Sequence, residues 1–127
     1  MADEHAIETY RSMITVGIEG LKALQLINGG AVVALLAYLG QAQDRATLAP
    51  LFARPLWVLL SGLTVGTLAF VGTYLTQLTL FNETQGRSGV TGTSHGAWLI
   101  ATICLSLISL ACFATGAFLA LGAFAAT

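Results

Sequence analysis

Long apolar runs without one charged side chain dominate the chain. These runs cover residues 23–43, 55–82 and 97–126. Each exceeds the roughly 20 residues that an α-helix needs to cross a hydrocarbon core of about 30 Å. Soluble helices have no need of apolar runs this long. The pattern therefore predicts an all-α integral membrane protein with three transmembrane helices. The expected spans are about residues 23–40, 56–81 and 96–126.

In the segment before the first apolar run, apolar residues recur every three to four positions. Its apolar positions are Ile7, Tyr10, Ile14, Ile18 and Leu21, and its polar positions are Glu4, Glu8, Arg11, Thr15, Glu19 and Lys22. The two sets lie on opposite sides of a helix, which predicts an amphipathic helix over about residues 3–22. Asp3 is the expected N-cap. Nothing interrupts the pattern before Ala23, so we expect one helix that continues into the first span.

Two connections are predicted from helix-breaking and turn-forming residues. The first span should end near Gly40, and Pro55 fits the first turn of the second helix, where its missing N–H costs no hydrogen bond. Residues 82–89 are typical of an exposed loop. Thr93 or Ser94 could cap the third helix.

Aromatic residues near the ends of the apolar runs suggest two membrane interfaces. Tyr38 and Trp57 flank the first connection, whereas Phe81 and Trp98 flank the second. Such residues are enriched where the hydrocarbon meets the headgroups. This arrangement predicts that the two ends of the chain lie on opposite sides of the membrane.

Composition narrows the classes of function. Only 9% of the 127 residues are charged and 56% are hydrophobic, against roughly 25% charged in a soluble domain. The net charge of −1 offers no basic surface for nucleic acid, so we expect no nucleic-acid partner. Three spans take up at least half of the chain, which predicts a single membrane domain over residues 1–127 without a separate catalytic domain.

Small residues follow a helical spacing on the second and third spans. They are Gly62, Gly66, Ala69 and Thr73 on the second span, and Thr102, Ser106, Ser109, Cys112, Gly116, Ala120 and Ala123 on the third. Small residues let helix backbones approach closely in a bilayer. These stripes are candidate packing faces. They could pack the helices of one chain together, or pack against other chains.

A polar cluster is expected near one end of the bundle. Its candidate members are Glu19, Lys22, Gln25, Asn28, Gln77, Glu83 and His95. Lys22 could pair with Glu19 or, across the bundle, with Glu83. Ionisable groups at membrane depth favour a pore mouth or a proton site. The alternative is a network at the membrane surface that fixes helix register.

Catalytic, cofactor and metal sites find no support in the sequence. Cys104 and Cys112 would lie about 12 Å apart on one helix, too far for a disulfide, and are interpreted as small packing residues. His95 lacks a second metal ligand at helical spacing. A Ser-His-acid set would need Ser94 or Ser88, His95 and Glu83 from one loop. We therefore expect a protein that is not an enzyme and binds no cofactor or metal.

Residues 22–40, KALQLINGGAVVALLAYLG, form a recognisable segment together with residues 74–77, YLTQ. They resemble a type of small, uncharacterised bacterial and prophage-encoded membrane protein with a Lys-Ala-Leu and Ile-Asn-Gly-Gly-Ala core. This resemblance covers about a fifth of the chain. It implies a protein of the bacterial inner membrane and transfers no active residue.

Two functions agree with these patterns. The first is a non-enzymatic protein that packs as an accessory or scaffold subunit, with membrane lipid and other membrane chains as partners. The alternative is a homo-oligomeric pore, such as a holin-like or membrane-disrupting effector. A water-filled conduit needs polar residues at all depths, but the polar stripe of the first helix stops at Asn28. Val32, Val33, Leu36 and Leu39 follow it, which favours packing.

Overall fold

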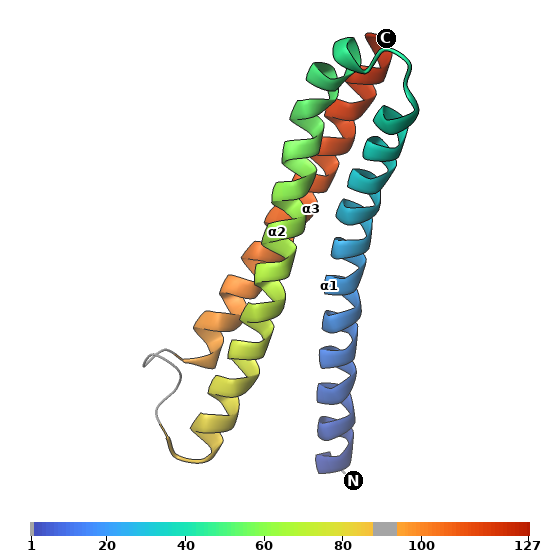
Figure 1. Ribbon diagram of the computed structural model, residues 1–127. Coiled ribbons are helices and arrows are strands. Elements are labelled where there is room, and N and C mark those ends of the chain that lie inside the picture. Colours follow the sequence, from blue (N-terminus) through green and yellow to red (C-terminus); the bar gives the residue numbers. More distant parts are fainter. Residues whose placement is uncertain (1, 88–93) are drawn as a thin grey trace.

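A computed structural model describes residues 2–87 and 94–127 as three long α-helices. They are α1 (Ala2–Gln41), α2 (Arg45–Thr84) and α3 (His95–Ala125). Helices α1 and α3 run in one direction and α2 runs in the other, so the two termini lie at opposite ends (Figure 1). Each helix is long and apolar enough to cross a membrane, and the residues described contain no strand. The all-α prediction with three transmembrane helices is confirmed, and the chain is a small integral membrane protein.

Helix α1 is a single helix of 40 residues. It includes both the segment expected to be amphipathic and the first apolar run, and it passes Gly29 and Gly30 without interruption. The helix already begins at Ala2, so Asp3 lies within the first turn, and its prediction as the N-cap is wrong.

The first connection is much shorter than predicted. Only residues 42–44 separate α1 from α2, and Pro50 and Pro55 both lie inside α2. The prediction of Pro55 in the first turn of the second helix is therefore wrong. A proline inside a helix removes a backbone hydrogen bond at a cost of about 3 kcal/mol. Burial offsets this cost here, because Pro55 and the neighbouring Phe52 are fully buried.

Contacts around the short connection fix the start of α2. Asp44 is the N-cap, and its carboxylate accepts a hydrogen bond from the backbone N–H of Thr47 at 3.4 Å. The guanidinium of Arg45 donates to the carbonyl oxygens of Gly40 and Ala42 at the end of α1. Carbonyls at a helix end lack partners within the helix, so Arg45 satisfies them and joins the two helices.

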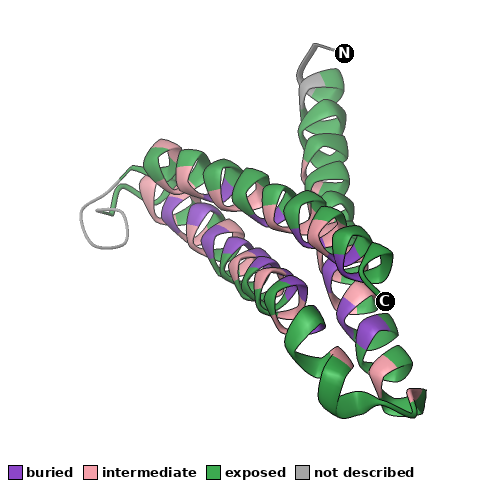
Figure 2. Ribbon diagram, turned by 90° about the horizontal axis from the view of Figure 1, so that it is seen from above, coloured by how far each residue is buried: buried purple, intermediate pink, exposed green. Residues whose placement is uncertain are grey.

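Helices α2 and α3 pack along a continuous seam of buried residues. The buried residues of α2 are Phe52, Pro55, Leu59, Gly62, Gly66, Ala69, Gly72, Thr76 and Thr79; those of α3 are Thr102, Ser109, Gly116, Ala120 and Ala123. The spacing on α2 is three or four residues throughout, with two successive spacings of three from Gly66 to Gly72, and on α3 it repeats every seven from Thr102 to Ala123. This 3.5-residue period is that of helices packed with a small left-handed crossing. Figure 2 shows the buried faces turned toward each other.

The end of the bundle near the first connection is closed by aromatic rings. Tyr38, Phe52 and Phe124 come from α1, α2 and α3, and their ring centroids lie 4.8–5.5 Å apart in edge-to-face geometry. Such pairs add about 0.5–1.5 kcal/mol each beyond area burial. Val32, Leu35 and Leu59 extend this core. All three helices are therefore held together at this end.

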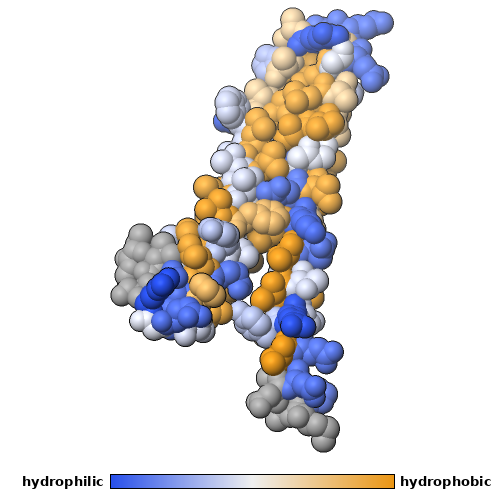
Figure 3. Space-filling model, turned by 60° about the horizontal axis from the view of Figure 1, so that its bottom comes forward, coloured by the Kyte–Doolittle hydropathy of each residue, from blue (hydrophilic) through white to orange (hydrophobic). Residues whose placement is uncertain are grey.

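The opposite end is open. The N-terminal half of α1 stands apart from the paired α2 and α3, as Figures 1 and 3 show. Exposed polar side chains cover much of this half of α1, including Glu4, Glu8, Arg11 and Thr15. The bundle is thus closed at one end and splayed at the other.

Candidate functional site

The small residues predicted for α2 lie mostly in the α2–α3 seam. Gly62, Gly66 and Ala69 are buried there, but Thr73 is only partly buried, and its hydroxyl donates to the carbonyl of Ala69 at 3.0 Å. Gly72, which the sequence analysis missed, takes its place in the seam. Spacings of four, three and four residues from Gly62 lead to Thr73, whereas the buried residues of α2 have a second spacing of three after Ala69.

The small residues predicted for α3 face the same seam. Ser109, Gly116 and Ala120 are buried, whereas Cys112 is partly buried. Glycines on one helix face larger side chains on the other. A Cβ at Gly66 would lie 3.1 Å from the Ser109 hydroxyl, one at Gly72 2.5 Å from the Thr102 hydroxyl, and one at Gly116 2.7 Å from Leu59. Both stripes are therefore used within the chain to bring α2 and α3 together.

Asn28 links α1 to this seam. Its side chain is fully buried. The amide nitrogen donates to the carbonyl of Leu24 at 3.0 Å, and lies 3.4 Å from the carbonyl and 3.3 Å from the hydroxyl of Ser109. The Ser109 hydroxyl donates in turn to the carbonyl of Gly62 at 2.8 Å. One polar network therefore joins all three helices.

Gln25, Lys22 and Glu19 continue from Asn28 toward the open end. Gln25 donates from its amide to the hydroxyl of Thr67 on α2 at 3.1 Å. Of the two partners considered for Lys22, the structure places Glu19 against it, at 2.7 Å. Both side chains remain exposed, by 55% for Lys22 and 63% for Glu19. Lys22 makes no contact with Glu83.

Glu83 and His95 form a separate pair at the end of the α2–α3 hairpin. The Glu83 carboxylate lies 2.5 Å from Nδ1 of His95 and accepts from its backbone N–H at 3.0 Å. These hydrogen bonds lower the pKa of the Glu83 carboxyl, which lies beyond the apolar segment ending at Phe81. Ser94 is the N-cap of α3, but its side chain makes no capping hydrogen bond; Thr93 lies outside the described residues. Glu83 therefore caps α3 in place of Ser94.

The polar residues predicted as one cluster thus lie in separate groups. Asn28 is in the seam, Gln25 bridges to α2, Glu19 and Lys22 pair on α1, and Glu83 pairs with His95. Gln77 lines the open space between α1 and α2.

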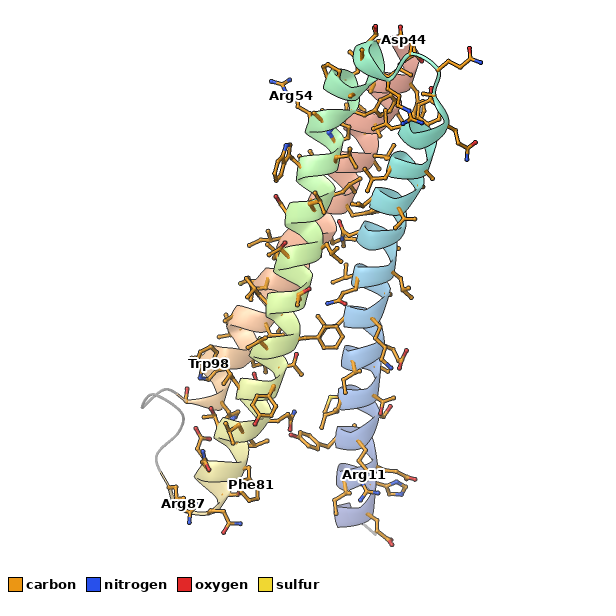
Figure 4. All side chains as sticks on the ribbon, viewed as in Figure 1. Arg11, Asp44, Arg54, Phe81, Arg87 and Trp98 are labelled. Atoms are coloured by element: carbon orange, nitrogen blue, oxygen red, sulfur yellow. The ribbon has the colours of Figure 1, made fainter. Side chains whose placement is uncertain are left out.

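The depth of the Glu19–Lys22 ion pair follows from the Gln25–Thr67 contact. Along α2, Trp57 and Phe81 are about 36 Å apart, close to the thickness of a bilayer core, and Thr67 lies near the middle. Lys22 and Glu19 lie about 5 and 9 Å from Gln25 along α1. Phe81 and Trp98 mark the same end of the bundle (Figure 4). The exposed ion pair therefore lies beside the apolar segment of α2, inside the level of Phe81.

A large apolar cleft occupies the open end of the bundle. Its volume is about 550 Å³, and all three helices line it. The wall from α1 is the apolar side of its N-terminal half, including Ile14, Gly17, Ile18 and Leu21. Figure 3 shows this end of the molecule.

Within residues 2–87 and 94–127, no three His, Cys, Asp or Glu side chains are grouped so that they could hold a metal ion. Comparisons with protein-family models, with curated proteins and with solved structures give no match. The function is therefore inferred from the arrangement of this chain's own residues.

Proposed function

We propose that this membrane protein is a non-enzymatic accessory or scaffold subunit of a membrane assembly, and that the polar face of α1 contacts a partner membrane chain. The face is formed by Glu8, Arg11, Thr15, Glu19 and Lys22, all of which are exposed. The resemblance of residues 22–40 favours the bacterial inner membrane as the location.

The exposed Glu19–Lys22 ion pair is the observation that carries the proposal. Charged side chains at membrane depth are costly, and they almost always face a protein interior or a water-filled cavity. Here both side chains of the pair are exposed, beside the apolar segment of α2. A partner chain would remove this pair from lipid. The stripes of small residues on α2 and α3 support the same proposal. They already pack against each other within the chain, which leaves the polar face of α1 as the surface for a partner.

A homo-oligomeric pore is the second candidate. The polar stripe of α1 could line a vestibule, but Asn28, its deepest member, is fully buried against Ser109. Beyond it, the exposed side chains of α1 include Val33 and Leu36. A conduit lined by this helix would lack polar groups over its second half. This favours the accessory or scaffold function.

Charge reversal on α1 tests the proposal. The variants are Glu19→Lys, Lys22→Glu and the exchanged pair Glu19→Lys/Lys22→Glu, and native mass spectrometry in mild detergent measures the assembled fraction. We expect each single reversal to lower that fraction, because it leaves two like charges together. The exchanged pair restores the ion pair within α1, yet should also lower assembly, because a partner would meet the charges in the wrong order.

Leu68→Ala serves as the control, since Leu68 is exposed on α2 away from α1. Wild-type assembly by the exchanged pair would contradict a partner that contacts Glu19 and Lys22. A protein that is monomeric when extracted from its own membrane would contradict the proposal as a whole.

A further inference from the structure

The cleft at the open end has the size of a ligand site. Its volume of about 550 Å³ falls in the range of about 300–1,000 Å³ typical of small-molecule pockets. A cavity of about 150 Å³ lined by apolar side chains holds one benzene ring, so this cleft could hold on the order of twenty carbon atoms. That amount corresponds to one lipid acyl chain.

The hydroxyl groups in the cleft wall are already hydrogen-bonded to their own helices. Thr76 donates to the carbonyl of Gly72 at 2.8 Å, Thr102 to that of Trp98 at 2.9 Å, and Ser106 to that of Thr102 at 2.8 Å. Such internal bonds leave the outer surface of the wall mainly methyl and methylene groups. The cleft interior thus suits a hydrocarbon rather than water.

The polar groups of the cleft gather at its mouth. Tyr10 on α1 and His95 on α3 are the lining residues of these helices nearest the open end, and on α2 Gln77 lies one turn inside Leu80. Arg11 follows Tyr10, and Arg87 lies at the same end of the bundle (Figure 4). Carboxylates lie beside these cations, since Glu83 pairs with His95 and Glu8 shares a groove with Arg11, so the mouth suits a polar lipid headgroup, and the apolar interior complements the chain attached to it.

We propose that the cleft holds one acyl chain of a membrane phospholipid, with its headgroup at the mouth near Tyr10 and His95. The cleft lies at the level of the apolar segments of α2 and α3, where phospholipid is the surrounding solvent. The bound chain fills the space between α1 and the α2–α3 pair. This inference is independent of the partner chain proposed above, because Glu19 and Lys22 do not line the cleft.

Gly17 provides a direct test. A Cβ there would meet no atom within 4 Å, and Gly17 lines the cleft, so Gly17→Phe places a ring in the space that the acyl chain would take. Gly30→Phe is the matched control, because Gly30 is equally unobstructed but does not line the cleft. The full chain is reconstituted in vesicles of phosphatidylethanolamine and phosphatidylglycerol, extracted in mild detergent and analysed by native mass spectrometry.

We expect the wild type and Gly30→Phe to retain one phospholipid per chain, and Gly17→Phe to lower the lipid-bound fraction about tenfold, equivalent to about 1.4 kcal/mol. Ser106→Leu fills the cleft from α3 and should lower the lipid-bound fraction in the same way. If circular dichroism shows that Gly17→Phe has lost its helices, Ser106→Leu takes its place as the test of the cleft. Equal retention by the wild type and the filled variants would overturn the proposal, as would no retention by the wild type. A wild-type dimer that Gly17→Phe abolishes would instead assign the cleft to a second copy of the chain and also overturn it.

Discussion

The side-chain oxygen of Asn28 lies within clashing distance of the position where any residue other than glycine at 62 would carry its Cβ. This oxygen has no hydrogen-bond partner within the part of the chain that the structure describes. The Cβ of Cys112 approaches the same point to 2.8 Å. Helices α1, α2 and α3 therefore converge on one glycine, and the close approach of α1 depends on the absence of a side chain there.

We predict that Gly62→Ala weakens the packing of α1 on the α2–α3 pair. Inserting a methyl group into a packed site costs about 1–3 kcal/mol, whereas replacing glycine by alanine in a helix gains at most about 1 kcal/mol. The free energy of unfolding in mixed micelles, followed by circular dichroism, should fall. Gly30→Ala is the control, because a Cβ at Gly30 meets nothing within 4 Å. Equal stability of the two variants would contradict the convergence at Gly62.

Asn28 and Ser109 should be energetically coupled. In membrane proteins, hydrogen bonds between helices contribute on average about 0.6 kcal/mol and up to about 2 kcal/mol. A double-mutant cycle of Asn28→Ala and Ser109→Ala should therefore give a coupling energy in this range. The same unfolding measurement applies. Strictly additive effects would show that the contacts of 3.3–3.4 Å contribute no stability.

Leu59 and Gly116 should compensate each other. A Cβ at Gly116 would lie 2.7 Å from Leu59, so Gly116→Ala should destabilise by about 1–3 kcal/mol. Leu59 is buried, and Leu59→Ala alone should cost about 2–5 kcal/mol. The double variant should lose less stability than the sum of the two, because the new methyl group enters the vacated space. If the stability losses of the two single variants simply add in the double variant, Leu59 and residue 116 do not contact each other.

The apolar runs alone predicted the three helices, since length and absence of charge suffice to identify a transmembrane helix. The boundaries of α2 could not be predicted in the same way. Prolines normally end a helix, yet Pro50 and Pro55 both lie inside α2, where Pro55 is buried together with Phe52 and Pro50 is exposed. Such burial depends on α1 and α3, which a local reading of the sequence does not include.

The residues of the candidate site could be predicted where helical spacing determines their position. They could not be predicted where contacts between helices determine it. Gly62, Gly66 and Gly116 followed from helical spacing on single helices. The burial of Asn28 did not, because the sequence placed it in one polar cluster with Gln25 and Lys22 near one end of the bundle. Its burial follows from the gap at Gly62, which is a property of the assembled bundle. The sequence also gave no sign that α1 would stand apart from α2 and α3 at Gly17.

The N-terminus and the C-terminus should lie on opposite sides of the membrane, because the three helices alternate in direction. His5→Cys and Ala126→Cys are introduced separately into a Cys104→Ala/Cys112→Ala background, which keeps the Cβ of residue 112 that faces Gly62. A maleimide that cannot cross membranes is added to intact vesicles of uniform orientation. Only one of the two sites should react until detergent is added. Reaction of both sites in sealed vesicles would contradict three spans.

The purified protein should not conduct ions steadily in planar bilayers. Asn28, the deepest polar residue of α1, is buried in the seam rather than exposed to a lumen. The exposed hydroxyls of Ser61, Thr64 and Thr67 on α2 donate to the carbonyls of Trp57, Leu60 and Leu63, so they cannot also donate hydrogen bonds to an anion or to water in a conduit. Single-channel recording should show no reproducible conductance for the wild type. Discrete currents whose ion selectivity changes with Glu19→Lys would contradict this prediction, because they would place the polar face of α1 along a conduit rather than against a partner.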